Sequence, residues 1–100
     1  METWAGQSTF QYTGSVAEGT TIIYGNGHSA RISSGQYSSL LAHFKGRTVP
    51  CGTSRTDPPP GSLGAWLQSN VSPTAYASYV GKILVVEGYA QKRGHDIQFK

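Results

Sequence analysis

The segment from Gly52 to Gly61, GTSRTDPPPG, limits what this chain can fold into more than any other part of the sequence. Its three consecutive prolines lack backbone N–H donors and hold the chain extended, so neither a helix nor a central strand can pass through it. The full chain has 100 residues, which is enough for one modest core. The sequence therefore predicts a single domain with regular elements on both sides of this segment.

Three elements are predicted before the proline-rich segment. Residues 20–24 and 28–33 are β-prone runs around Gly25-Asn26-Gly27, and such turn residues tolerate positive φ, so we expect a hairpin. A helix follows a cap at Ser33 or Ser34, with apolar residues at helical spacing and a stop at Gly46. Its apolar face consists of Tyr37, Leu40, Leu41 and Phe44. Residues 47–51 predict a short strand that Pro50 restricts to a sheet edge or a strand end.

Two helices and a second hairpin are predicted after that segment. Ser62 caps a helix whose apolar positions are Leu63, Trp66 and Leu67. A turn at residues 70–73 leads to the next helix, expected from Pro73 to about Glu87, with Ser72 as its N-cap and Gly88 as its stop. Residues 89–99 then predict a hairpin with the basic tip Lys92-Arg93-Gly94.

Residues 1–19 differ from the rest of the chain in composition. They are rich in Gly, Ser, Thr and Gln, with isolated aromatic residues such as Trp4 and Phe10. Residues 9–13 are the one short run there with strand character. We expect a flexible N-terminal arm over residues 1–19, with Trp4 unstructured, and one domain over residues 20–100.

The predicted order from residue 34 onward is helix, short strand, helix, turn, helix and hairpin. This order, together with the segment from Ala77 to Ala90, resembles the winged helix-turn-helix family, in which a small residue, a leucine and a glycine precede the wing. Ala77, Leu84 and Gly88 occupy those places. The resemblance implies an α+β fold of three helices and a small antiparallel sheet, here with an N-terminal hairpin that extends the wing sheet or pairs two copies.

Gly81 departs from the family pattern, which has a larger apolar residue at that place. A glycine inside a helix costs about 1 kcal/mol relative to alanine. Two explanations remain open: close packing against Trp66, or a broken helix. The stretch from Gly52 onward is also similar to small bacterial proteins of phage or plasmid type, which implies no particular activity.

Charge is unevenly distributed along the chain. Residues 1–44 carry one basic and two acidic residues, and residues 45–100 carry seven basic and three acidic residues, giving balances of −1 and +4. A basic half favours an anionic partner, although a balance of +4 is also ordinary for a small domain.

In a winged helix, the third helix enters the major groove and the hairpin forms the wing, which contacts the DNA backbone. The candidate DNA-binding residues are accordingly Arg55, Ser72, Thr74, Tyr76, Ser78, Tyr79, Lys82, Lys92 and Arg93. The helix offers hydroxyl groups and Lys82, which suit phosphates and weak base readout.

Five of these assignments have an alternative. Lys92 and Arg93 also suit a hairpin tip that is basic only for solubility, and Arg55 suits a solvated loop. Tyr76 and Tyr79 either stack on bases or sugars, or pack half-buried against the protein.

The sequence gives little support for catalysis or metal binding. Cys51 could pair with His28, His43 or His95 as a nucleophile, but no surrounding motif supports this, and a small buried hydrophobic role is favoured. Neither paired carboxylates nor a metal-ligand spacing is present. We therefore expect no enzyme activity, no cofactor, no metal and no small-molecule substrate.

No apolar run reaches the length needed to span a bilayer, and a single cysteine fits a reducing setting, so a cytoplasmic location is expected. The predicted function is that of a double-stranded DNA-binding protein, either a small transcriptional regulator or a mobile-element accessory protein. The alternative is a winged-helix module that binds a protein partner, for example host machinery, or a second copy of itself.

Overall fold

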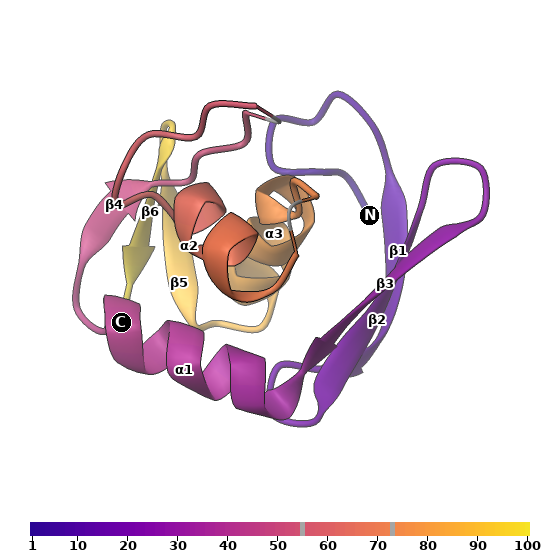
Figure 1. The fold of residues 1–100 in the computed structure, drawn as a ribbon, viewed down its shortest axis with the longest axis horizontal. Coiled ribbons are helices and arrows are strands. Elements are labelled where there is room, and N and C mark those ends of the chain that lie inside the picture. Colours follow the sequence, from indigo (N-terminus) through magenta and orange to yellow (C-terminus); the bar gives the residue numbers. More distant parts are fainter. Residues whose placement is uncertain (55, 73) are drawn as a thin grey trace.

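The computed structural model describes residues 1–54, 56–72 and 74–100. Over these residues the elements are β1 (Phe10–Ser15), β2 (Gly19–Tyr24), β3 (His28–Ser33), α1 (Ser34–Phe44), β4 (Thr48–Pro50), α2 (Leu63–Asn70), α3 (Ala77–Val86), β5 (Ala90–Arg93) and β6 (Asp96–Phe99). The fold is α+β, as the sequence predicts. α2 and α3 lie between two small sheets, and α1 runs below both of them (Figure 1).

The first sheet is an antiparallel meander in the order β1-β2-β3. The predicted hairpin is confirmed as β2 and β3, with Tyr24 opposite His28 at its end. The structure differs from the expected arm in two ways, because residues 10–15 form β1 and Trp4 is buried. Phe10 of β1 and Ile22 of β2 are both buried. The burial of Phe10 holds β1 in the sheet.

The second sheet has the order β4-β6-β5 and is separate from the first. The N-terminal hairpin therefore does not extend the second sheet, which corrects the expectation that it extends the sheet predicted as the wing. β4 lies at an edge, as Pro50 requires. Lys92 and Arg93 belong to β5 and pair with Ile97 and Asp96, so they lie on the strand before the turn and not at its tip.

The first two helices begin where the sequence predicts. Ser33 caps α1: its side chain accepts a hydrogen bond from the Gln36 backbone N–H, and the Gln36 side chain accepts one from the Ser33 N–H. Ser62 caps α2 through a hydrogen bond from the Ala65 N–H at 3.1 Å. Local capping is therefore sufficient to place both starts.

α3 begins at Ala77, later than the predicted start at Pro73, which itself lies outside the described residues. Ser72 accepts a hydrogen bond from the Thr74 N–H at 3.3 Å, but residues 74–76 are not helical. Tyr76 contacts the Tyr24 ring instead of continuing the helix. Tertiary packing thus overrides the local start signal, and residues 71–76 separate α2 from α3.

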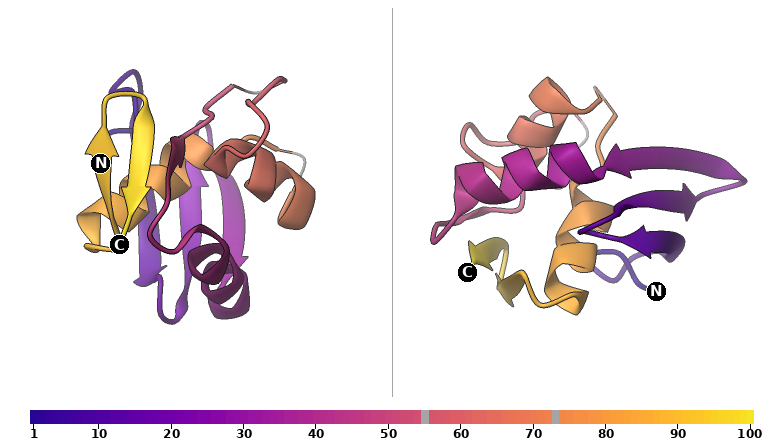
Figure 2. Two further views of the ribbon diagram at one scale, coloured as in Figure 1. Left: turned by 90° about the vertical axis from the view of Figure 1, so that its left-hand side faces the viewer. Right: turned by 90° about the horizontal axis from the view of Figure 1, so that it is seen from below.

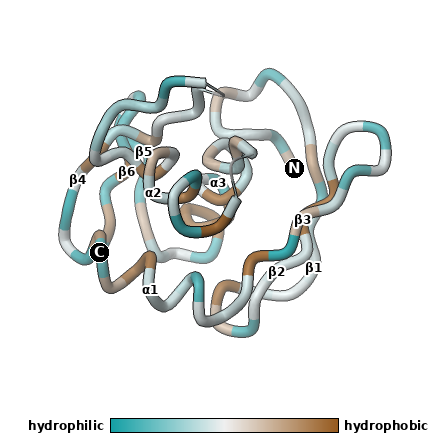
Figure 3. The backbone as a smooth tube through the Cα atoms, in the orientation of Figure 1, coloured by the Kyte–Doolittle hydropathy of each residue, from teal (hydrophilic) through white to brown (hydrophobic). Residues whose placement is uncertain are grey.

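The core fills the space between α1, α3 and both sheets. Phe44 of α1 stacks on Phe99 of β6, with ring centroids 5.0 Å apart, and this joins α1 to the second sheet. Thr20 and Tyr37 share a buried hydrogen bond of 2.7 Å, which joins α1 to the first sheet. Two further views confirm that α3 lies between the sheets (Figure 2). Hydrophobic segments are prominent on the central helices, and hydrophilic ones lie at the β2–β3 turn (Figure 3).

The proline-rich loop is anchored where its two ends meet. The Gly64 N–H donates to the Cys51 carbonyl at 2.9 Å. A side chain on Gly64 would collide with the Gly52 carbonyl, so glycine is required there by the close approach of two backbones. Among the described residues, no helix has the length and hydrophobicity to cross a membrane.

Candidate nucleic-acid interface

The positions predicted to bind DNA separate into two groups in the structure. Ser78, Lys82, Lys92 and Arg93 belong to one side of α3 and to β5, whereas Thr74, Tyr76 and Tyr79 face the β2–β3 turn. Ser72 lies in the connection before α3. Arg55 lies outside the described residues.

Trp4 connects the first group. Its backbone N–H donates to the Ser78 carbonyl of α3 at 2.9 Å. The Lys92 ammonium of β5 donates to the Trp4 carbonyl and lies 5.0 Å from the centroid of the Trp4 ring. Since Trp4 is only 6% exposed, this contact fixes the basic strand beside α3.

Gly81 explains how Trp4 can lie so close to the helix. A Cβ atom at this position would lie 2.9 Å from Cys51 Sγ and 3.0 Å from Trp4 Cε3. Of the two explanations left open, close packing is therefore the one observed, although the partners are Cys51 and Trp4 and not Trp66. α3 is continuous through Gly81.

Arg93 is exposed and oriented by its neighbours. Its Nε donates to Gln98 Oε1 at 2.7 Å, and its Nη2 donates to Gln91 Oε1 at 3.0 Å. Both partners are neutral amides, so neither places a negative charge beside the guanidinium. Arg93 therefore presents a positioned cation at the end of β5.

The second group forms a cluster of rings. Tyr79 of α3 lies between Tyr24, at 4.9 Å between centroids, and Phe10, at 5.2 Å. Tyr76 makes an edge contact with Tyr24 at 6.1 Å, and His28 stacks on the other side of the turn at 5.6 Å from Tyr24. Tyr76 and Tyr79 are both half-buried, as the packing alternative predicts.

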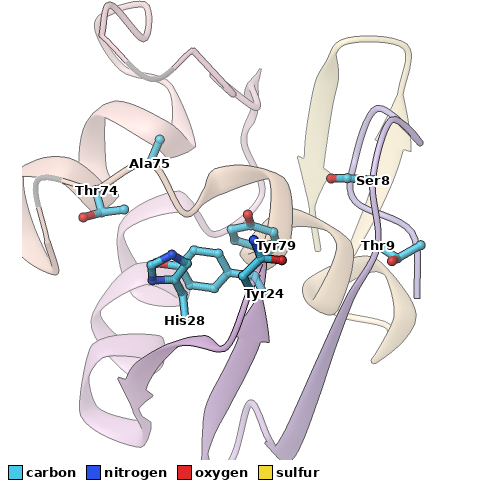
Figure 4. A pocket seen from close by; sticks show the side chains of 9 residues that line it. Ser8, Thr9, Tyr24, His28, Thr74, Ala75 and Tyr79 are labelled. Carbon is cyan, nitrogen blue, oxygen red and sulfur yellow. The ribbon is translucent and has the colours of Figure 1, made fainter.

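An open hollow of about 860 Å³ lies over these rings, and we call it the ring pocket. Its lining includes the rings of Tyr24, His28 and Tyr79 and the hydroxyl groups of Ser8, Thr9 and Thr74. Figure 4 shows the three rings grouped at the centre of the view, with Thr74 on one side and Ser8 and Thr9 on the other. The glycines at both ends of the turn, Gly25 and Gly27, have positive φ, which closes the β2–β3 turn beside the pocket.

Burial changes the acidity of two groups near this interface. Desolvation, followed by a hydrogen bond with Tyr76, raises the pKa of Tyr24 above its ordinary value. Burial raises the pKa of Cys51 to about 12, against a smaller opposing effect of the Lys92 charge. The Cys51 thiol is therefore neutral and buried, which is the opposite of what a thiolate nucleophile needs.

Sequence reasoning missed the residues of this interface that precede α1, among them Trp4, Tyr24 and His28. The one available signal was Gly81, since a glycine inside an otherwise apolar helix indicates a close neighbour. Within the described ranges, no cluster of three or more His, Cys, Asp or Glu side chains could hold a metal ion.

Comparison of the chain with protein-family models, with curated proteins and with solved structures finds no match. The interface itself is therefore the basis for inferring a function.

Proposed function

We propose that this protein binds double-stranded DNA in the manner of a winged helix, with α3 as the recognition helix and the β5–β6 hairpin as the wing. Two features of the topology support this. α1, β4, α2, α3, β5 and β6 follow one another in the winged-helix order, and β4 pairs with β6 at the edge of the second sheet. One feature departs from the pattern. The connection between α2 and α3, residues 71–76, is longer than the three or four residues of a typical helix-turn-helix.

The contact of Trp4 with Ser78 and Lys92 is the observation that carries the proposal. It places the strand that carries Lys92 beside the side of α3 that carries Ser78. Lys82 lies one turn beyond Ser78 on that side of α3. An ammonium has three N–H donors, and only one of those on Lys92 is used by Trp4, so the others remain available for a phosphate.

This arrangement favours contacts with the DNA backbone over base readout. The exposed Arg93 suits a phosphate because its planar guanidinium can donate two parallel hydrogen bonds. The hydroxyl of Ser78 supplies one further donor. Such an interface fits a small regulator or mobile-element accessory protein that depends on shape and charge, and a cytoplasmic location belongs to the same proposal.

The test is the salt dependence of binding to a generic DNA duplex. Affinity of the unmodified protein should fall steeply with salt, since log K declines by about 0.9 per neutralised phosphate for each unit of log salt. The double variant Lys92→Ala and Arg93→Ala should reduce this slope by about 2. A double variant Arg31→Ala and Lys45→Ala removes the same charge elsewhere and serves as the control. If both double variants bind alike, with the parent's slope, the proposal fails.

A protein partner is the second candidate, and Val86 favours it. This residue lies on α3 four positions after Lys82 and is 51% exposed, which places an apolar side chain within the presumed DNA-facing side. Apolar area on an exposed helix face suits a protein interface better than a phosphate backbone. Absence of duplex binding up to high micromolar protein at low salt would favour this candidate.

A further inference from the structure

We propose that the ring pocket binds an unpaired nucleobase, so that the protein recognises DNA with exposed single-stranded bases next to the surface formed by Ser78, Lys82, Lys92 and Arg93. The proposal rests on the proposed function for its phosphate contacts, but its own basis is the ring pocket. Base stacking on aromatic side chains is the usual means of holding single-stranded nucleic acid, because every base has a π-face.

The size and form of the pocket suit a nucleotide. Its volume of about 860 Å³ lies within the range of small-ligand sites, roughly 300 to 1,000 Å³. It is open to solvent, so a base that is still attached to its strand can enter without passing a closed lid. A duplex base pair remains inside its stack and cannot enter the pocket.

The rings are already held in place before a ligand arrives. Tyr24 contacts Tyr79 at 4.9 Å and His28 at 5.6 Å, and Phe10 supports Tyr79 from the core side at 5.2 Å. His28 is exposed, so one face of its imidazole is free to receive a base. Little side-chain entropy is then lost on stacking, which favours binding.

The polar groups around the rings suit the edge of a base. The Asn26 amide offers both a donor and an acceptor, and the hydroxyl groups of Thr9 and Thr74 can do either. Among the described residues that line the pocket there is no Lys, Arg, Asp or Glu. The pocket therefore suits an uncharged polar ring better than a phosphate.

A path leads from the ring pocket to the cationic surface. A second hollow of about 170 Å³ shares Ser8, Ala75 and Tyr79 with the ring pocket and extends to Ser78. Ser78 in turn contacts Trp4, which holds Lys92. A strand whose base occupies the pocket can therefore run toward Lys92 with its phosphates.

Two oligonucleotides of equal length separate base binding from phosphate binding. One is a twelve-residue oligodeoxythymidylate, and the other is an abasic strand with the same sugars and phosphates. Fluorescence anisotropy of the labelled strands with the full chain should show about tenfold or greater preference for the strand with bases. Equal affinity for the two strands overturns the proposal while leaving the proposed function standing.

His28→Ala is the decisive variant, since this side chain is exposed and its loss should leave the fold intact. It should reduce the preference for the strand with bases to less than half, without changing affinity for the abasic strand. His43→Ala removes another exposed histidine, which lies on α1, and should keep the full preference. A preference that is unchanged in His28→Ala overturns the proposal.

Lys92→Ala with Arg93→Ala distinguishes the two hypotheses. It should weaken binding to both strands by the same factor and preserve their ratio. If it leaves both affinities unchanged while His28→Ala still removes the preference, the phosphate surface is refuted and the ring pocket is supported.

Discussion

The two sheets of this protein are both antiparallel and three-stranded, yet they present different chemistry to solvent. The first has strands of six residues, and its end beside α3 carries the Tyr24 and His28 rings. The second has strands of three or four residues and carries Lys92 and Arg93. Between them, α3 contacts the first sheet through Tyr79 and reaches the second through Trp4.

Under the two proposals, recognition is divided between two supports within one small fold. Rings need neighbours that fix their planes, and the longer strands provide them. Cations that bind phosphates must be exposed and held in one orientation. On the β5–β6 hairpin, Trp4 orients Lys92, and Gln91 and Gln98 orient Arg93. We therefore expect that substitutions in one sheet can impair the binding proposed for that sheet without impairing the other, although both sheets share one core.

The largest expected effect comes from truncating the ring that attaches each sheet to its helix. Phe44→Ala removes the stacking on Phe99, and Phe10→Ala removes the contact with Tyr79. Each should lower the free energy of unfolding by about 3 to 5 kcal/mol, because both rings are buried. Urea denaturation measures this. Ile23→Ala, at a side chain 43% exposed on the first sheet, is the control and should change stability by less than about 0.5 kcal/mol.

If Phe10→Ala costs less than about 1 kcal/mol while Phe44→Ala costs the full amount, the first sheet does not share the core of the second.

A smaller effect is expected from filling the space beside Trp4. Gly81→Ala improves helix propensity, yet its Cβ would lie 2.9 Å from Cys51 Sγ, so we expect a net loss of about 1 to 3 kcal/mol. Thermal unfolding measures the loss, and duplex binding by the same variant shows whether the helix still holds the second sheet. In α1, a Cβ at Gly35 meets nothing closer than 3.9 Å. Gly35→Ala should therefore stabilise the protein, and equal effects of the two changes would contradict the packing at Gly81.

The direct link between the two regions should be worth about 1 kcal/mol. A double-mutant cycle of Trp4→Ala and Lys92→Met isolates the coupling between this ring and the ammonium, since each single variant carries its own packing cost. Stability from urea denaturation gives the coupling energy. A value indistinguishable from zero would mean that the second sheet holds its cations without help from the N-terminal segment.

The smallest effect at neutral pH concerns groups whose contribution appears only in alkali. Burial raises the pKa of Tyr37 to about 12, and burial with a hydrogen bond from Tyr12 to Glu87 raises the pKa of Tyr12 to about 12. An unfolded tyrosine ionises near pH 10, so the folded state favours the protonated form. The contribution of these two tyrosines to the free energy of unfolding should therefore be fully present below pH 10 and be lost as the pH rises to 12.

Absorbance of tyrosinate during a pH titration checks this for the chain's six tyrosines. Two of them should ionise near pH 12 while the fold persists. Ionisation of all six near pH 10 in a protein that remains folded would contradict the burial of Tyr12 and Tyr37.

Most of the fold after residue 19 could be predicted from local signals. Capping residues and apolar spacing predicted α1 and α2, and Gly25-Asn26-Gly27 predicted the β2–β3 hairpin. α3 was predicted too early, because the ring contact of Tyr76 with Tyr24 joins residues far apart in the sequence. β1 lies where the sequence predicts an arm, for the same reason: its partner strand β2 supplies the stability that its composition lacks.

The candidate site was predictable only in part. The sequence indicated the cations of β5 and the polar side of α3, since both follow from periodicity and charge. It did not indicate that Trp4 connects them or that Tyr24 and His28 face α3, because these contacts depend on how two sheets are placed around one helix. The winged-helix arrangement and DNA binding stay proposals.

The position of Trp4 also affects its fluorescence. The chain has two tryptophans, and they differ in environment, since Trp4 is 6% exposed beneath an ammonium and Trp66 is only partly buried on α2. Indole emission depends on nearby charge and on contact with water. With Trp66 replaced by phenylalanine, the fluorescence emission maximum of Trp4 would report whether the N-terminal segment stays packed on α3 when a ligand binds Lys92. Trp4 is thus an intrinsic fluorescent probe of the contact between α3 and the second sheet.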